Sequence, residues 1–219
     1  MKELLFWTKK IKNKIKGGNI IMEDTIMIVE AKNILVLCNP QKDYVTGPMG
    51  NAEAINAEQG LVKLIQSETS DGKSVWDSIY FQMDIHYDDY LDTMEGVWNP
   101  VKHCISDTDG SGILSSVNKA LGDCKCNVQF GCDKHGFVSM NMIENITHRI
   151  NNILNKEESV SITIAGFNTD VTVLGTALTL RSIFPDIEIQ IAPFACAGTN
   201  RSDHVSAINL MKNNNIFVN

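Results

Sequence analysis

The stretch VSITIAGFNTDVTVLGTALTLRSIFPD, residues 160–186, decides the fold class of this chain. Its first six residues are rich in β-branched and apolar side chains, which predicts a buried strand. After a short turn, apolar residues recur at helical spacing on one face: Val171, Leu174, Leu178 and Ile183. The segment 184–186, Phe-Pro-Asp, then ends the helix. A strand, a turn and a helix in this order are typical of a parallel sheet connected through helices.

The same alternation extends outward from this stretch, from Asn33 to the end of the sequence. Apolar runs predict strands at 34–38, 78–83, 127–130, 160–165, 187–191 and 216–218, with helices between them. The 219 residues, of which 43% are hydrophobic, are enough to bury the core of one such domain. We therefore predict an α/β fold, a three-layer Rossmann-like sandwich in which helices flank a mostly parallel sheet of about six strands.

Residues 1–30 are predicted to form a basic extension ahead of the main domain, residues 31–219. Lysines separate apolar residues that recur at roughly helical spacing: Leu4, Trp7, Ile11 and Ile15. This pattern predicts a basic amphipathic helix that ends at Gly17 and Gly18. Such a helix has the chemistry to touch an anionic membrane or a partner, and a frayed extension is the alternative. It is too short and too charged to span a bilayer, and it lacks the apolar core of a signal peptide.

The charge distribution argues against nucleic acid as a partner of the main domain. The net charge is -7, whereas residues 1–17 carry six lysines and one glutamate, a surplus of +5. The remainder therefore carries -7 - 5 = -12. Such an acidic body repels a phosphate backbone instead of attracting it.

The cysteines favour a reducing, cytoplasmic setting. There are six of them: Cys38, Cys104, Cys124, Cys126, Cys132 and Cys196. Neither a signal peptide nor a small disulfide-rich architecture accompanies them, so we expect thiols. Cys124, Cys126, Cys132 and His135 can also be drawn as a zinc cluster. Their spacing matches none of the common zinc patterns, and the segment also has the pattern of a strand.

Three polar stretches fall beyond the carboxyl ends of predicted strands, where open α/β sheets bind their ligands. In the first, Asp84 and His86 directly follow a strand, and His103 lies further along the chain. A carboxylate and two imidazoles can bind a divalent metal, either zinc or iron or manganese, and leave positions for water or substrate. Taken alone, three such residues are more often surface or core side chains than metal ligands.

The second stretch, residues 166–173, leaves a strand and opens a helix, so its backbone N–H groups can hold an anion or oxyanion. An ordinary strand-to-helix turn is the alternative. The third is Lys134, near the end of a strand and followed by His-Gly-Phe-Val-Ser at 135–139. A solvated lysine is the alternative there.

These stretches occur in the order found in isochorismatase-like and nicotinamidase-type cysteine hydrolases, and the resemblance runs from residue 34 to residue 218. Residues 39–44, Asn-Pro-Gln-Lys-Asp-Tyr, resemble the family's first motif, Asp-x-Gln-x-Asp-aromatic. Asp84, His86 and His103 resemble its metal motif, and the separation of the histidines, 103 - 86 = 17, also fits. The segment at Lys134 resembles the one that carries the family's lysine, and residues 166–173 resemble the one that carries its nucleophile.

The resemblance implies hydrolysis of amides or related bonds by an Asp-Lys-Cys triad, with nicotinamide as the best-known substrate. It also implies an oxyanion site at the nucleophile turn, beside a non-proline cis peptide that here precedes Asn168. Asn168, Tyr44 and Trp98 are then the expected substrate-binding residues, the two aromatic rings as an apolar pocket wall or, alternatively, as core packing. A homo-oligomer is expected, and no organic cofactor.

Two of the three triad positions differ from the family pattern. The base position is Asn39 and the nucleophile position is Thr172, so only Lys134 is retained. An amide cannot accept a proton as a carboxylate does, and a hydroxyl ionises far less readily than a thiol. Cys38 is no substitute, because alternation along a strand points it to the opposite face from position 39.

We therefore predict a family member that lacks normal cysteine-hydrolase activity but keeps a pocket for a metal and a small ligand, nicotinamide-like or another small amide. This is the pattern of a pseudoenzyme. The alternative is an active hydrolase of nicotinamide or a related small amide that uses metal-bound water or Thr172.

Overall fold

The computed structural model describes residues 14–16, 19–21, 31–134, 136–156 and 158–219. Its contacts divide the chain into two units, Met1–Glu30 and Ala31–Asn219. None of the helices in the described ranges has both the length and the apolarity needed to cross a membrane.

The described part of the first unit is a short antiparallel pair of strands, β1 (Lys14–Lys16) and β2 (Asn19–Ile21). Ile15 pairs with Ile20 across it. The predicted amphipathic helix is therefore wrong at its C-terminal end, because residues 14–16 form a strand there. The rest of that predicted helix, residues 1–13, lies outside the described residues.

The second unit is built on a six-stranded parallel sheet in the order β5-β4-β3-β6-β7-β8. The strands are β3 (Ala31–Cys38), β4 (Ser78–Asp84), β5 (Asn127–Lys134), β6 (Ser159–Phe167), β7 (Glu188–Ala197) and β8 (Phe217–Val218). Each overlaps one of the six predicted runs. The predicted fold class is thus confirmed.

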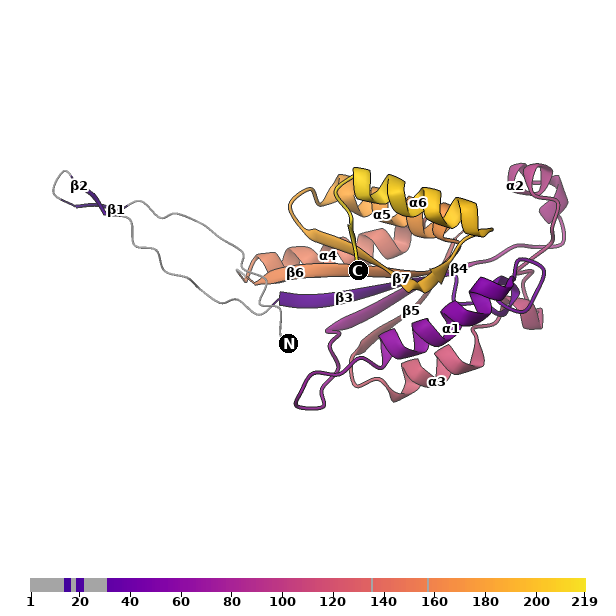
Figure 1. The fold of residues 1–219 in the computed structure, drawn as a ribbon, viewed down its shortest axis with the longest axis horizontal. Helices are drawn as coiled ribbons and strands as arrows, with labels where there is room; N and C mark the ends of the chain where they lie inside the picture. Colours follow the sequence, from indigo (N-terminus) through magenta and orange to yellow (C-terminus); the bar gives the residue numbers. More distant parts are fainter. Residues whose placement is uncertain (1–13, 17–18, 22–30, 135, 157) are drawn as a thin grey trace. The chain divides into compact units, whose positions relative to one another are not determined.

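Helices cover both faces of this sheet. The helices are α1 (Ala52–Ile65), α2 (Met94–Trp98), α3 (Ser115–Asp123), α4 (Met140–Leu154), α5 (Leu174–Ile183) and α6 (Arg201–Asn213). Figure 1 shows α1 and α3 on one face and α4, α5 and α6 on the other, while α2 extends beyond one end of the sheet. This is the three-layer arrangement expected when parallel strands are connected through helices.

The central strand β3 shows why the sheet needs two helical layers. Residues 34–38, Ile-Leu-Val-Leu-Cys, have no exposed surface at all, although their side chains alternate between the two faces. A strand that is apolar on both faces must be covered on both. Asn33 begins the run and is held at the amino end by the Asp77 carboxylate and the Val75 carbonyl, 2.8 and 3.1 Å away.

The helix predicted after residue 168 forms, but its buried face differs from the predicted one. The chain first makes a π-helical turn, Thr169–Val173, and only then enters α5. Val171 and Ile183 are 39% and 41% exposed, whereas Val173, Ala177 and Leu180 are fully buried. A π-turn contains more residues per turn than an α-helix and so rotates the side chains that follow it, which the simple apolar spacing did not anticipate.

Gly60 permits the close packing of α1 on β7, and this gives a test of the layer contact. A Cβ at this position would collide with the carbonyl oxygen of Phe194. We expect Gly60→Ala to lower the free energy of unfolding by about 1–3 kcal/mol, as overpacking does. The matched control is Gly122→Ala on α3, where a Cβ meets no atom within 4 Å; it should raise stability by about 0.5–1 kcal/mol. Urea unfolding midpoints distinguish the two, and equal shifts would contradict the packing argument.

Candidate functional site

The polar residues singled out by the sequence gather at the carboxyl edge of the sheet. Asn39 directly follows β3, Asp84 ends β4, Lys134 ends β5 and Asn168 follows β6. The register pairs Asp84 with Lys134 on neighbouring strands. Because all these strands are parallel, their carboxyl ends meet at one edge, and the loops that leave them build a common site.

Asn39 and Thr172, 133 residues apart in sequence, are hydrogen-bonded to one another. Asn39 Nδ2 donates to Thr172 Oγ1 at 3.2 Å and to Asp84 Oδ2 at 2.9 Å. A carboxylate only accepts hydrogen bonds, so the Asp84 oxygen fixes which end of the Asn39 amide faces it. The amide nitrogen is thereby aimed at the hydroxyl. The positions that resemble the family's base and nucleophile therefore meet, and the group at the base position is a donor.

The backbone of Asn39 contributes to this arrangement. Its φ of 45° lies in the left-handed region, which asparagine tolerates better than most residues. Its N–H donates to the Gln82 carbonyl at 2.9 Å, which anchors the turn to β4. The side chain is fully buried, and it points from the end of β3 toward both β4 and the nucleophile turn.

Asp84, His86 and His103 form a compact donor cluster. Their ligand atoms all lie within 4.8 Å of one another, and all three side chains are buried. A parallel bridge between His86 and Ile105 brings the loop that carries His103 alongside the end of β4. The two imidazole rings are 4.7 Å apart, centroid to centroid. The three residues predicted to hold a metal are thus brought together.

The hydrogen bonding of His103 suits it to a metal. Its Nδ1 lies 2.8 Å from the carbonyl oxygen of Val101. A carbonyl can only accept, so Nδ1 carries the proton and the lone pair of the neutral ring is on Nε2. This Nε2 atom is buried and makes no hydrogen bond within the described residues. A backbone carbonyl that fixes the tautomer of a histidine is the usual second partner of a metal-ligating imidazole.

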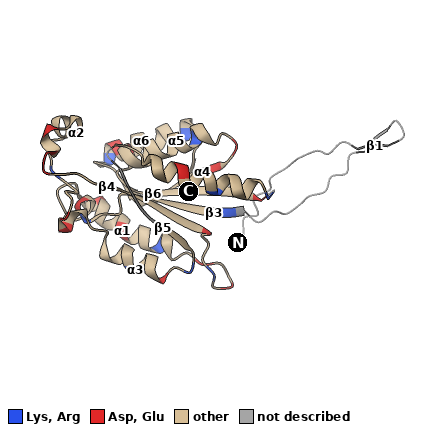
Figure 2. Ribbon diagram, turned by 180° about the vertical axis from the view of Figure 1, so that it is seen from behind, with Lys and Arg blue, Asp and Glu red and all other residues tan. Residues whose placement is uncertain are grey.

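A second carboxylate, which was not among the predicted site residues, lies beside the cluster. Glu95 on α2 places Oε1 at 3.8 Å from His86 Nε2 and 3.7 Å from His103 Nε2. Figure 2 shows acidic residues on α2 and on the segment that leads to it. Two imidazoles with one or two carboxylates fit zinc, and also iron or manganese. The acidic run 88–95 between the two histidines was the signal available in the sequence.

Two further side chains of the first motif support the cluster, in roles that were not predicted from the sequence. Gln41 is fully buried and holds the backbone of Asp84 from both sides: its Nε2 donates to the carbonyl and its Oε1 accepts from the N–H, both at 2.8 Å. Asp43 Oδ2 accepts from the Cys104 N–H at 2.7 Å, next to His103. These two side chains fix the backbone on either side of the donor cluster.

Tyr44 contacts the cluster directly. Its hydroxyl donates to Asp84 Oδ2, and its ring meets the His103 ring edge-on at 5.7 Å. Burial, and then the charge of Asp84, raise the pKa of Tyr44 well above its usual value, so the phenol stays protonated. In this structure Tyr44 is a hydrogen-bond partner of the carboxylate, which differs from the expected role of an apolar pocket wall.

Trp98 does not lie in a buried wall. Its side chain is 83% exposed on α2, although Glu95 on the same helix approaches the histidines. The expectation that Trp98 lines an apolar pocket is therefore not met in this structure. The helix is only five residues long, and nothing in the sequence indicated which of its sides faces the site.

The nucleophile turn has the expected geometry. The peptide between Phe167 and Asn168 is cis. Gly166 precedes it with φ at 121°, and a Cβ there would collide with the carbonyl oxygen of Cys38. The Asn168 carbonyl accepts from the N–H groups of residues 171 and 173. Its side chain donates to Thr199 Oγ1 at 3.2 Å and so ties the turn to the loop after β7.

The remaining predictions concern Lys134 and the cysteines. The side chains of residues 130–135 lie outside the described part, so the orientation of Lys134 stays a prediction. The Cys38 sulfur accepts from Gln82 Nε2 at 3.4 Å. Cys124 and Cys126 are joined by a disulfide, so the expectation that all cysteines are thiols is wrong for this pair, and neither is available as a zinc ligand. The side chain of Cys132, and His135, lie outside the described residues.

Comparisons with known proteins agree with this architecture. The model of a family described as isochorismatase domain matches residues 33–218. The chain is similar to nicotinamidase/pyrazinamidase from Bacillus subtilis, with 22% identity and a TM-score of 0.65 over 85% of this chain and 98% of that one. It is also similar to pyrazinamidase of Pyrococcus horikoshii in complex with zinc, with 18% identity and a TM-score of 0.64 over 86% and 98%.

A protein from L. infantum in complex with nicotinate is similar at 12% identity, with a TM-score of 0.64 over 86% of this chain and 92% of that one. No curated protein matches the sequence. At these identities the solved structures establish the shared fold.

The Gln41 clamp yields a prediction for metal affinity. Gln41→Leu keeps the side-chain volume but removes the hydrogen bonds that hold Asp84, so we expect zinc affinity to fall about 10–100-fold, as loss of outer-shell support usually does. Titration calorimetry with zinc measures this. Gln59→Leu, the same change at an exposed position of α1, should leave affinity unchanged. A folded Gln41→Leu protein with unaltered affinity would rule out the clamp.

Proposed function

Since the chain belongs to the isochorismatase family, we propose that it binds a small amide-like or acid-like ligand beside a divalent metal ion and does not perform the family's cysteine hydrolysis. The observation that carries this proposal is the 3.2 Å hydrogen bond from Asn39 Nδ2 to Thr172 Oγ1. Hydrolysis through a covalent intermediate needs a proton acceptor at that point, and the side chain present there is a donor.

The loss affects both members of one catalytic unit. A threonine hydroxyl holds its proton much more tightly than a thiol, so it needs a stronger base than cysteine does. Asn39 offers no base and occupies a lone pair of the hydroxyl with its own N–H. Nucleophile and base act together, and removal of either lowers turnover by roughly four to six orders of magnitude. Turnover through Thr172 is therefore expected to be negligible.

The binding half of the proposal rests on the donor cluster. The ligand atoms of three buried side chains, Asp84, His86 and His103, lie within 4.8 Å of one another. The Oε1 atom of Glu95 lies 3.7–3.8 Å from the Nε2 atoms of the two histidines and can complete the set of ligands. When bound, a divalent metal supplies an electrophilic point that can orient a nitrogen or oxygen donor of a ligand. The complexes of similar proteins with zinc and with nicotinate support a small aromatic amide or acid as the ligand class.

Metal-assisted hydrolysis is a second candidate, and one observation favours it. Asn39 Nδ2 bonds to Asp84 and to Thr172 at once, so the donor cluster and the nucleophile position are two hydrogen bonds apart. A ligand carbonyl held at Thr172 would lie close to the cluster. In this case amide cleavage requires the metal and is independent of a thiol.

Ligand binding without turnover is tested by heat stability. We expect nicotinamide or nicotinate to raise the unfolding temperature of the zinc-loaded protein, by an amount that grows with ligand concentration above Kd. Asp84→Ala should abolish the shift, whereas Asp89→Ala, an exposed acid in the same segment, should preserve it. Ammonia release is measured in parallel. Release from the zinc-loaded protein that stops on chelation would replace the binding proposal with metal-assisted hydrolysis.

Restoring the two altered positions tests why hydrolysis is lost. We expect Asn39→Asp with Thr172→Cys to hydrolyse nicotinamide at least about 100-fold faster than the native chain, because both members of the unit return together. Either substitution alone should stay near the native level. Ammonia release gives the rates, and circular dichroism checks folding. A folded double variant that reacts with iodoacetamide at the new thiol but releases no ammonia would show that more than these two positions has been lost.

A further inference from the structure

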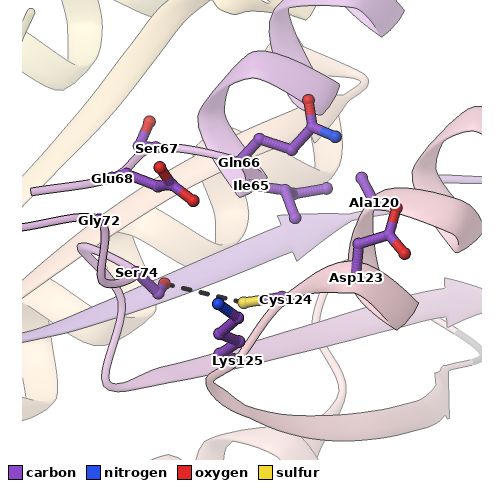
Figure 3. A pocket seen from close by; sticks show the side chains of 10 residues that line it. All are labelled: Ile65, Gln66, Ser67, Glu68, Gly72, Ser74, Ala120, Asp123, Cys124 and Lys125. Carbon is purple, nitrogen blue, oxygen red and sulfur yellow. Dashed lines mark hydrogen bonds between the residues drawn. The ribbon is translucent and has the colours of Figure 1, made fainter.

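A hollow unrelated to the metal cluster opens at the amino-end edge of the sheet, the opposite edge from Asn39. It is formed by the end of α1 and the segment that leads from it to β4, and by the end of α3 and the segment that leads from it to β5, and its cavity volume is about 170 Å³. Figure 3 shows the side chains around it, with Cys124 and Lys125 on one side and residues 65–68 on the other.

A disulfide lies at the wall of this hollow. Cys124, which lines it, is bonded to Cys126, two residues further along the chain. Both residues are partly exposed. The Ser74 hydroxyl lies 3.7 Å from the Cys124 sulfur (Figure 3).

At this position the disulfide contributes little to the stability of the fold. It closes a loop of three residues and links no separate elements of the fold, whereas the stabilisation from a disulfide grows with the length of the loop that it closes. A partly exposed disulfide of this kind is open to attack by a thiolate, and accessible disulfides are the ones that exchange. When reduced, the two thiols remain neighbours, so the bond can readily form again.

We propose that Cys124 and Cys126 form a thiol–disulfide exchange site whose co-reactant is a small zwitterionic thiol, of the class of cysteine and short cysteinyl peptides. Charges of both signs line the hollow: the cation of Lys125 and the carboxylates of Glu68 and Asp123. A ligand that carries both a carboxylate and an ammonium group matches this lining. Lys125 also favours the thiolate form of a neighbouring cysteine.

The exchange balances in two steps. In the first step, the thiolate of one small thiol attacks Cys124 Sγ and forms a mixed disulfide with it. The Cys124–Cys126 bond breaks, and Cys126 leaves as a thiolate that takes up a proton. The thiolate of a second small thiol then attacks the small-thiol sulfur of the mixed disulfide. A bond forms between the two small-thiol sulfurs, the bond to Cys124 Sγ breaks, and Cys124 leaves as a thiolate that takes up a proton. The protein gains two electrons and two protons, and the two small thiols become one disulfide.

The other cysteines with described side chains serve as internal controls. Cys38, Cys104 and Cys196 are buried, with 0%, 0% and 5% of their surface exposed. Burial raises the pKa of Cys196 to about 12, so this group is a thiol at neutral pH. These three residues should not react in the folded protein.

The experiment compares alkylation at each cysteine in the folded full chain. The protein is first incubated with glutathione disulfide, and then with reduced glutathione or with neutral mercaptoethanol, followed by iodoacetamide and mass spectrometry of peptides. We expect reduced glutathione to expose Cys124 and Cys126 together while the three buried cysteines stay unlabelled. Lys125→Glu should slow the reaction of glutathione, which carries carboxylates in addition to its thiolate, about fivefold in low salt, and slow the reaction of mercaptoethanol, whose thiolate is its only charge, by a smaller factor.

A variant isolates the intermediate. Cys126→Ser, incubated with glutathione disulfide, should gain one glutathione at Cys124, because no second thiol remains to release it. Three results would overturn the proposal: a Cys124–Cys126 bond that resists glutathione in the folded protein, both residues remaining alkylatable thiols after glutathione disulfide, or equally fast labelling of the buried cysteines. A Lys125→Glu effect that is the same for both thiols would refute the zwitterion assignment.

Discussion

The buried carboxylate of Asp84 is the group on which the rest of the site depends. A charge taken out of water is costly unless it is hydrogen-bonded or bound to a cation, and Asp84 is 4% exposed. Its side chain accepts hydrogen bonds from Asn39 and Tyr44, and its backbone is held by Gln41. These three partners come from the segment that follows β3, so one stretch of chain holds both the carboxylate and the backbone of Asp84. The same hydrogen bonds position it next to the histidines and limit what Asn39 can do for Thr172.

Much of the fold and the composition of the site could be predicted from local sequence patterns. Six apolar runs gave the six strands because buried parallel strands are short and nearly continuous in apolar residues. Asn39, Asp84 and Thr172 could be placed at one site because parallel strands bring their carboxyl ends to one edge. Hydrogen bonding between Asn39 and Thr172 is consistent with that expectation, and the loss of the base follows from the chemistry of an amide.

Other features depend on tertiary contacts that leave no local pattern. Glu95 approaches the histidines only because α2 folds back on the loop, whereas Trp98, three residues later, is turned outward. The Gln41 side chain holds the backbone of Asp84 on a different strand, and the spacing of residues in the sequence does not indicate such a contact. The π-turn before α5 rotated the buried face away from the apolar stripe. The disulfide between Cys124 and Cys126 also escaped prediction, because the cysteine count was interpreted through the compartment and not through proximity.

The register of β3 has a consequence for the order in which the molecule assembles. β3 pairs with β4 on one side, but on the other side Ala31 pairs with Ser159, 159 - 31 = 128 residues later. During synthesis from the N-terminus, this strand, apolar from Ile34 to Cys38, therefore leaves the ribosome long before its second neighbour exists. Pairings so distant in sequence form slowly, and unpaired strand edges promote aggregation in the meantime. The nascent chain thus passes through a period in which one edge of the apolar strand β3 has no strand to pair with.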